Sequence, residues 1–143
     1  MFLLDTNVIP ALSPSGREAA RDLVVWLDRA SRHLFVSAIT AAEVASGIAK
    51  AEREGASATA RPRREWWQAI EHLYREKRLP FDLECAPAAG AIPDDARAHR
   101  AGFEDIAATA RVHGLTVPAR SPRNFEPLGV PVLDPFQVCP SLP

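Results

Sequence analysis

The 143-residue chain has little cysteine, and its positive and negative charges nearly cancel. Its two cysteines, Cys85 and Cys139, form no CxxC pair, which argues against both a cysteine-based zinc site and a disulfide-rich scaffold. The formal net charge of −1 provides no global basic field that would draw the protein onto nucleic acid. Any contact with nucleic acid must therefore be local.

Targeting and membrane signals are also missing. The N-terminus lacks the basic flank and long apolar core of a signal peptide, and no stretch approaches the roughly 18 apolar residues that a membrane helix needs. We therefore expect a cytoplasmic protein with no membrane association. The length and the 47% hydrophobic content predict one domain with a sizeable core, which we place at residues 1–136, followed by a C-terminal tail at residues 137–143.

Short apolar runs alternate with helical patterns along the chain. Strands are predicted at residues 2–4, 33–37, 78–82, 115–117 and 130–133. Helices are predicted at residues 17–30, from Thr40 onward, around residues 66–74, in a proline-broken form within residues 84–102, and at residues 106–114. This alternation predicts an α/β fold in which helices flank a central parallel sheet.

The first strand ends abruptly in the polar run Asp5-Thr6-Asn7. In open α/β sheets, ligands bind at the carboxyl ends of the strands, so Asp5 is a candidate metal-binding carboxylate. Alternatively, Asp5 only caps a helix that begins near Val8. These residues alone do not separate the two interpretations.

Glu43 also has two interpretations. It stands three residues after Thr40, the spacing of a capping box, in which its side chain would bond the Thr40 backbone. However, Glu43 also follows the second predicted strand, so it would lie at the same sheet edge as Asp5 if the two strands are parallel. Two carboxylates would then converge.

The concentrated basic run at residues 61–64 contains Arg61, Arg63 and Arg64. It is either a solvated helix start or a phosphate-contacting lip beside the candidate site. An aromatic stripe follows at helical spacing, and it is compatible with core packing, a dimer face or a partner groove: Trp66, Trp67, Ile70, Leu73 and Tyr74.

Four blocks of the sequence, in this order and over nearly the whole chain, resemble the PIN-domain toxins of the VapC family. They are Leu3-Leu4-Asp5-Thr6-Asn7, Val36-Ser37-Ala38-Ile39-Thr40-Ala41-Ala42-Glu43, Ile106-Ala107-Ala108-Thr109-Ala110-Arg111-Val112-His113-Gly114-Leu115, and Phe125-Glu126-Pro127-Leu128-Gly129-Val130-Pro131-Val132-Leu133. The resemblance implies a three-layer α/β/α fold and an acidic cluster that binds Mg²⁺ or Mn²⁺. It also implies endoribonuclease activity on RNA, usually in a homodimer neutralised by a small antitoxin protein.

Asp5 and Glu43 match metal-binding positions of the family, and Thr6 and Asn7 match the polar pair beside the first acid. Such a site suits phosphodiester hydrolysis, because a divalent cation offsets phosphate charge and lowers the pKa of bound water, and hard cations prefer oxygen ligands. The hydroxyl and amide could orient the carboxylate or a metal-bound water.

The second half of the site departs from the family pattern. The third acid normally stands three residues before the isoleucine of the third block, where this chain has Phe103, whereas Asp105 directly precedes Ile106. Two residues turn a helix by about 200°, so Asp105 is either directed away from the metal or supplied from a helix that starts later. The fourth acid is replaced by Asn124, and the adjacent family motif is altered, with Ser121 as a supporting residue.

We therefore expect Asp5, Glu43 and Asp105 to bind metal and Asn124 to act as a weaker ligand or water-positioning group. Arg61, Arg63, Arg64 and Arg120 are candidate RNA contacts. Pro118 also removes a backbone donor from a predicted central strand beside the site. These departures suggest a weakened nuclease; the alternatives are a non-catalytic PIN-like protein that binds an antitoxin or another partner, and a decayed chain that folds poorly.

Overall fold

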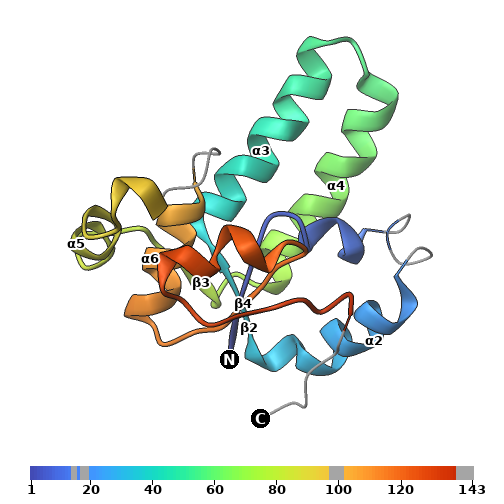
Figure 1. Cartoon of the computed structure of the whole chain (residues 1–143). Helices are drawn as coiled ribbons and strands as arrows, with labels where there is room; N and C mark the ends of the chain where they lie inside the picture. Colours follow the sequence, from blue (N-terminus) through green and yellow to red (C-terminus); the bar gives the residue numbers. More distant parts are fainter. Residues whose placement is uncertain (14–15, 17–19, 97–101, 138–143) are drawn as a thin grey trace.

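The computed structural model describes residues 1–13, 16, 20–96 and 102–137, and in them the predicted parallel sheet is present (Figure 1). Its strands are β1 (Phe2–Leu4), β2 (Leu34–Ser37), β3 (Arg78–Leu79), β4 (Val117–Pro118) and β5 (Val132–Leu133). β2 pairs with β1 and β3, and β4 pairs with β5. A bridge between Phe2 and Thr116 joins the two ladders, giving the spatial order β3-β2-β1-β4-β5.

Helices cover both faces of this sheet, as α2 (Arg21–Ala30), α3 (Ala38–Arg53), α4 (Ser57–Leu73), α5 (Cys85–Gly90) and α6 (Phe103–Val112). Successive residues of a strand face opposite sides, and β1 shows which helices lie on each. Phe2 and Leu4 pack with buried residues of α2, α3 and α4, whereas Leu3 packs with α6. The predicted three-layer arrangement is therefore confirmed, and within the described residues no helix is long and apolar enough to cross a membrane.

Short 3₁₀ turns connect these elements. They are η1 (Ile9–Leu12), η2 (Ser31–His33), η3 (Asp94–Ala96), η4 (Pro122–Asn124) and η5 (Glu126–Leu128). The helix predicted at residues 17–30 is present as α2 from Arg21 to Ala30; Ala20 before it is not helical, with φ −141°, and residues 17–19 lie outside the described residues. The predicted break after α5 is confirmed, whereas residues 97–101, Cys139 and nearly all of the predicted tail lie outside the described residues.

The cap of α3 differs from the predicted capping box. Ser37, not Thr40, is the N-cap, and its hydroxyl oxygen accepts a hydrogen bond from the Thr40 backbone N–H at 2.9 Å. The Ser37 hydroxyl donates to Thr40 Oγ1, which in turn donates to the Leu4 carbonyl oxygen at 3.1 Å. These buried bonds tie the start of α3 to the end of β1. Because Ser37 caps the helix, Glu43 lies in its second turn and is not needed as a cap.

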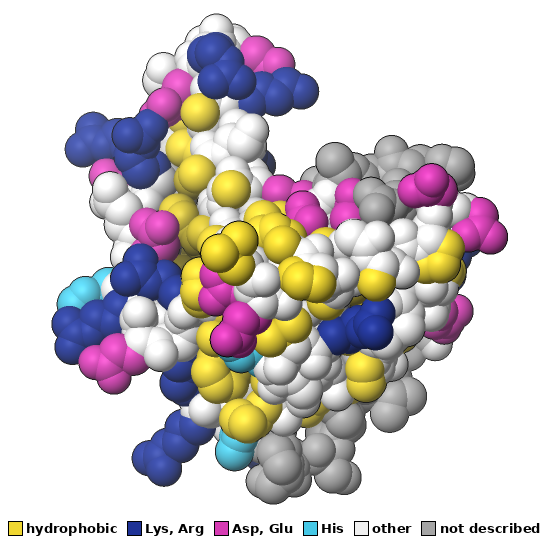
Figure 2. Space-filling view, turned by 90° about the vertical axis from the view of Figure 1, so that its left-hand side faces the viewer, with side chains coloured by type: hydrophobic (Ala, Val, Ile, Leu, Met, Phe, Trp, Pro, Cys, Tyr) yellow, Lys and Arg dark blue, Asp and Glu magenta, His cyan; other side chains and the backbone are white. Residues whose placement is uncertain are grey.

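Helices α3 and α4 form a hairpin that projects from the body of the molecule (Figure 1). Figure 2 shows hydrophobic side chains running along this hairpin toward the body, with basic side chains at its outer end. The aromatic stripe on α4 is mainly core, because Trp67, Ile70 and Tyr74 are buried. Leu73 is 69% exposed and Trp66 is half-buried, so only this part of the stripe remains available to a partner.

Pro118 explains why the sheet is nearly divided in two. Val117 and Ala119 donate their backbone N–H groups to β5, and Thr116 donates toward β1, to the Met1 carbonyl oxygen at 3.1 Å. Alternate residues of a strand bond to alternate neighbours, so the next donor toward β1 would come from residue 118. Proline has no N–H to give, and the pairing of β1 with β4 ends there.

We predict that Ser37→Ala lowers the free energy of unfolding by about 1–2 kcal/mol, because the Thr40 N–H loses its acceptor inside the core. Urea denaturation measures this change. Ser46→Ala, at an exposed position of the same helix, is the matched control and should stay within about 0.5 kcal/mol of the parent protein. Equal stability of the two variants would contradict the role of Ser37 as a buried cap.

Candidate active site

Asp5 lies directly after β1 and is only 1% exposed. Its Oδ2 accepts hydrogen bonds from Asn7 Nδ2 at 3.1 Å and from the Asn7 backbone N–H at 3.3 Å. Its Oδ1 is buried without a hydrogen-bond partner. Asp5 is not the cap of the following helical turn, because the N-cap of η1 is Val8; one Asp5 oxygen instead organises the turn at Asn7, and its role as a metal ligand stays a prediction.

The electrostatic environment of Asp5 opposes its negative charge. Burial is the main cause that raises the pKa of this carboxyl above its usual 3.8, and the neighbouring charge of Glu43 adds to the effect. Hydrogen bonds from Asn7 and Thr6 act in the opposite direction. A divalent cation would satisfy the unpartnered oxygen and offset both charges, so the pair Asp5 and Glu43 fits a hard cation.

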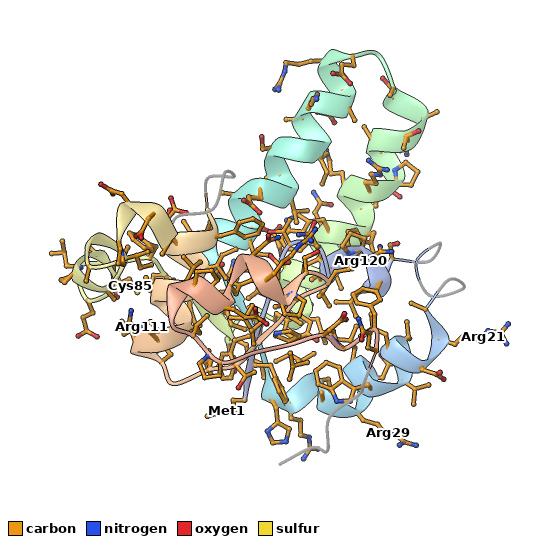
Figure 3. The ribbon with its side chains drawn as sticks, viewed as in Figure 1. Met1, Arg21, Arg29, Cys85, Arg111 and Arg120 are labelled. Atoms are coloured by element: carbon orange, nitrogen blue, oxygen red, sulfur yellow. The ribbon has the colours of Figure 1, made fainter. Side chains whose placement is uncertain are left out.

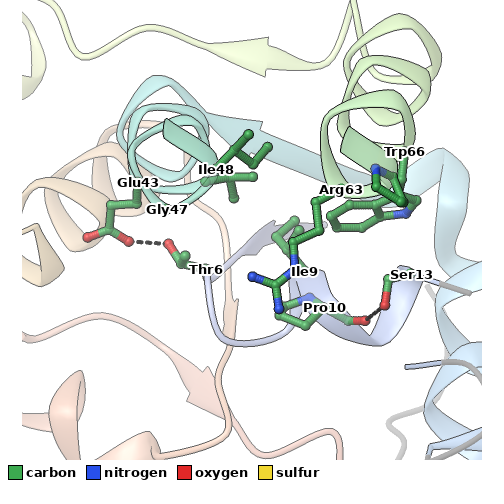
Figure 4. A pocket seen from close by; sticks show the side chains of 11 residues that line it. Thr6, Ile9, Pro10, Ser13, Glu43, Gly47, Ile48, Arg63 and Trp66 are labelled. Atoms are coloured by element: carbon green, nitrogen blue, oxygen red, sulfur yellow. Dashed lines mark hydrogen bonds between the residues drawn. The ribbon is translucent and has the colours of Figure 1, made fainter. Parts of the chain in front are cut away.

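Glu43 approaches this position from α3. Its Oε2 accepts a short hydrogen bond from Thr6 Oγ1, which links the helix to the segment that follows β1 (Figure 4). Gly102, at the start of α6, lies against the other carboxylate oxygen, and a Cβ atom there would be 2.6 Å from Glu43 Oε1. Gly102 also has φ +104°, which favours glycine. Three segments therefore meet at Glu43.

The α6 side of the site does not supply the predicted third ligand. Helix α6 already begins at Phe103, whose ring is buried and packs edge-on against Phe125 at 5.0 Å. Asp105 is two residues further around this helix and is only partly buried. Among the described residues, no three Asp, Glu, His or Cys side chains form a group that could hold a metal ion, so Asp105 does not complete a set with Asp5 and Glu43.

Glu104 has no predicted role. In the structure it is partly buried near the start of α6, and its Oε2 is buried without a hydrogen-bond partner. The only sequence signal was its place between Phe103 and Asp105, and no motif position of the resembled family falls on it. Glu104 is therefore a further carboxylate of the α6 start whose desolvated oxygen is unusual.

Ser121 and Asn124 follow β4, so they leave the sheet at the same edge as Asp5 and the start of α3. The Asn124 backbone N–H donates to the Ser121 carbonyl oxygen at 3.0 Å and closes the η4 turn. Both residues are partly buried. The topology thus places them on the expected edge, and their roles as a weaker ligand and a supporting group stay predictions.

The four candidate RNA-contacting arginines are in different situations. Arg61 pairs with Glu65 at 3.1 Å on α4, and Arg64 pairs with Glu52 on α3. Arg120 lies over the Phe136 ring, 5.2 Å from its centroid (Figure 3). Arg63 lines a pocket of about 530 Å³ that also contains Thr6 and Glu43 (Figure 4). Of the three arginines in the basic run, Arg63 is thus the one that lines the same pocket as Glu43.

Comparisons with known proteins identify the family of this chain. The PIN domain family model matches residues 2–118. The chain is 36% identical over 142 residues to the toxin FitB of Neisseria gonorrhoeae, covering 95% of this chain and 99% of that protein. It is 33% identical to the VapC ribonuclease Y4jK of Sinorhizobium fredii, covering 96% and 99%.

Solved structures give the same result. The crystal structure of FitAcB from Neisseria gonorrhoeae matches with a TM-score of 0.74 and 32% identity, covering 96% of this chain and 100% of that one. FitAB bound to an IR36 DNA fragment matches with a TM-score of 0.77 and 31% identity, covering 96% and 97%. The predicted fold and the resemblance to PIN-domain toxins are therefore confirmed.

We predict that Asp5→Asn stabilises the metal-free protein at neutral pH by about 1 kcal/mol, or about 3 °C in Tm, because a buried charge is removed while the acceptor for Asn7 is kept. The folded-state pKa of Asp5 is raised, so the stability that its protonation contributes is full below pH 3.8 and is lost as the pH rises through the folded pKa. The advantage of the variant should therefore vanish in acid. Thermal unfolding measured across this pH range tests it, and an unchanged or lower Tm at neutral pH would contradict it.

We predict that Gly102→Ala weakens Mn²⁺ binding, because the new methyl group would displace Glu43. The backbone strain of alanine at positive φ adds a loss of about 1–2 kcal/mol in stability. Gly114→Ala is the matched control, since Gly114 has φ +63° but open space around its Cβ position. Calorimetric titration should show weaker binding in the first variant alone; equal affinities would mean that Gly102 does not position Glu43.

Proposed function

Because the chain belongs to the PIN domain family, we propose that it is the toxin of a type II toxin-antitoxin module and hydrolyses RNA phosphodiester bonds as a metal-dependent endoribonuclease. The observation that carries this proposal is the buried, unpartnered Oδ1 of Asp5, next to the charge of Glu43. Leaving such an atom unsatisfied costs folding free energy, which a bound cation would recover.

In this proposal Asp5 and Glu43 hold Mg²⁺ or Mn²⁺, which when bound supplies charge neutralisation for the phosphate and a lower pKa for the attacking water. Asn7 fixes the Asp5 carboxylate through two hydrogen bonds, and Thr6 fixes Glu43 through its hydroxyl. Both carboxylates are thus held in place before a ligand arrives. Asn124 is proposed as a weaker ligand or water-positioning group, with Ser121 supporting it.

The same structure favours one alternative, a PIN-like protein that binds its partner without cleaving RNA. Phe103 fills the place of the third acid and is packed against Phe125, so this half of the site has exchanged charge for core packing. Two carboxylates attract a divalent cation less than three or four do. Metal affinity therefore decides between the two functions.

The proposed partners follow from the relatives. FitB is named as a toxin, and the matching solved structures include FitAB and VapBC bound to DNA fragments. We propose that this chain likewise binds a small cognate antitoxin and forms a homodimer. The proposed substrate, cellular RNA, places its action in the cytoplasm.

Titration of Mn²⁺ into the purified protein, followed by an RNA cleavage assay in the same buffer, tests the function. We expect binding and metal-dependent cleavage that Asp5→Ala and Glu43→Gln both abolish. Glu84→Gln removes an exposed carboxylate just before α5; it is the control and should change neither Mn²⁺ binding nor RNA cleavage.

The outcomes separate the candidates. Binding and cleavage that depend on Asp5 and Glu43 support the nuclease. A folded protein that binds no Mn²⁺ at millimolar concentration and cuts no RNA would overturn it and leave the partner-binding alternative. Cleavage that persists in Asp5→Ala would point to a contaminating nuclease and remove the support for this site.

A further inference from the structure

The pocket that contains Thr6 and Glu43 also has an apolar part, which the proposed metal site does not use. It extends from Thr6 and Glu43 between η1, α3 and α4, and its volume of about 530 Å³ is within the usual range of small-ligand sites (Figure 4). Its wall beyond the acids is formed by Ile9, Pro10, Ile48, Pro62 and Trp66. The pocket therefore has Glu43 at one end and a wall made of one indole ring, two proline rings and aliphatic side chains.

A hydrogen bond holds the Trp66 side chain in place, and the side chain forms part of the pocket wall. Its Nε1–H donates to the Leu12 carbonyl oxygen at 3.1 Å, which ties the indole to the end of η1. Trp66 is half-buried, whereas Trp26 and Trp67 are each only 5% exposed. An immobilised indole with proline rings in the same pocket is suited to stack against a planar ring.

Arg63 provides the positive charge of the pocket. It precedes Trp66 by one helical turn, and Figure 4 shows its side chain reaching from α4 toward Pro10. Arg61 and Arg64 are engaged with Glu65 and Glu52, whereas Arg63 has no ion pair among the described residues. A ligand that fits this pocket should therefore combine a planar apolar group with negative charge.

The polar groups of the wall are already used. The Ser13 hydroxyl donates to the Pro10 carbonyl oxygen at 2.6 Å and accepts from the Gly16 N–H at 3.1 Å. The Thr6 hydroxyl donates to Glu43, and the Trp66 N–H donates to Leu12. With these groups committed, the charged side chains Arg63 and Glu43 are what the pocket has left for contacts with the edges of a bound ring.

We propose that this pocket is a stacking subsite for one unpaired nucleobase of RNA, with Trp66 against the base and Arg63 beside the sugar-phosphate backbone that leads to Asp5 and Glu43. The biological ligand rests on the proposed nuclease function. The subsite accepts single-stranded RNA, because a paired base cannot present its face, and it tolerates different bases, favouring purines for their larger stacking surface.

Fluorescence titration with adenosine 5′-monophosphate in metal-free buffer tests the subsite, with excitation at the red edge of the indole band, outside adenine absorption. We expect quenching by this nucleotide and little effect from ribose 5-phosphate. Calorimetry should show that Trp66→Leu weakens nucleotide affinity by about tenfold or more. Trp67→Phe, in the core, is its control and should bind normally, and thermal unfolding verifies that each variant is folded.

Arg63→Gln provides an independent variant at an exposed position, and it should weaken nucleotide binding by about threefold or more, with a larger effect at low salt. Arg61→Gln is its control and should bind as the parent protein does. Equal binding of the nucleotide and ribose 5-phosphate would overturn the base subsite, as would normal affinity in Trp66→Leu. Quenching by an acetylated leucine-rich tripeptide but not by the nucleotide would also overturn it, in favour of an apolar peptide site.

The nuclease and the subsite fail separately in these measurements. RNA cleavage without nucleotide quenching removes the subsite alone. Nucleotide quenching without metal binding or cleavage removes the proposed nuclease and leaves a nucleotide-binding pocket to explain.

Discussion

The burial of the Asp5 carboxylate at the end of β1 is an unfavourable interaction that the surrounding structure must offset. Desolvation opposes its charge, Glu43 adds repulsion, and one carboxylate oxygen has no hydrogen-bond partner. Asn7 offsets part of this cost through the other oxygen, and the bonds from Ser37 through Thr40 to Leu4 hold the neighbouring backbone in place. Residues that keep a charge out of water in this way are characteristic of functional sites, where stability is given up for a preorganised ligand position.

The half of the fold that follows local rules could be predicted from the sequence. The apolar run at residues 2–4, the strand before Ser37 and the acids after them are specified by short-range patterns, and parallel pairing brings Asp5 and Glu43 to one edge. The spacing of Thr40 to Glu43 fits a capping box and so points to Thr40 as the cap of α3. Ser37 takes this role because the helix begins three residues earlier, and Thr40 bonds to Leu4, a contact that sequence spacing does not show.

Features that depend on contacts distant in sequence could not be predicted. Arg61, Arg63 and Arg64 form one basic run; Arg61 pairs locally with Glu65, but the pairing of Arg64 with Glu52 on α3 and the position of Arg63 at the pocket depend on how α3 and α4 pack. Trp66 and Trp67 are adjacent on α4 and point in different directions; Trp67 is buried in the core, whereas Trp66 bonds to Leu12 at the pocket, a contact 54 residues away in sequence. The start of α6 is similar, because Phe103 packs against Phe125, a partner 22 positions away that the sequence does not reveal.

Pro118 affects how firmly the two halves of the site are held together. Among the described residues, the bridge from Phe2 to Thr116 joins the ladder that carries Asp5 to the ladder that leads to Ser121 and Asn124, and Leu3 packs with α6 beside this junction. The edge of the sheet that carries Asp5 and Ser37 and the edge that leads to Ser121 and Asn124 are therefore held in register by few backbone hydrogen bonds, and side-chain packing supplies the rest.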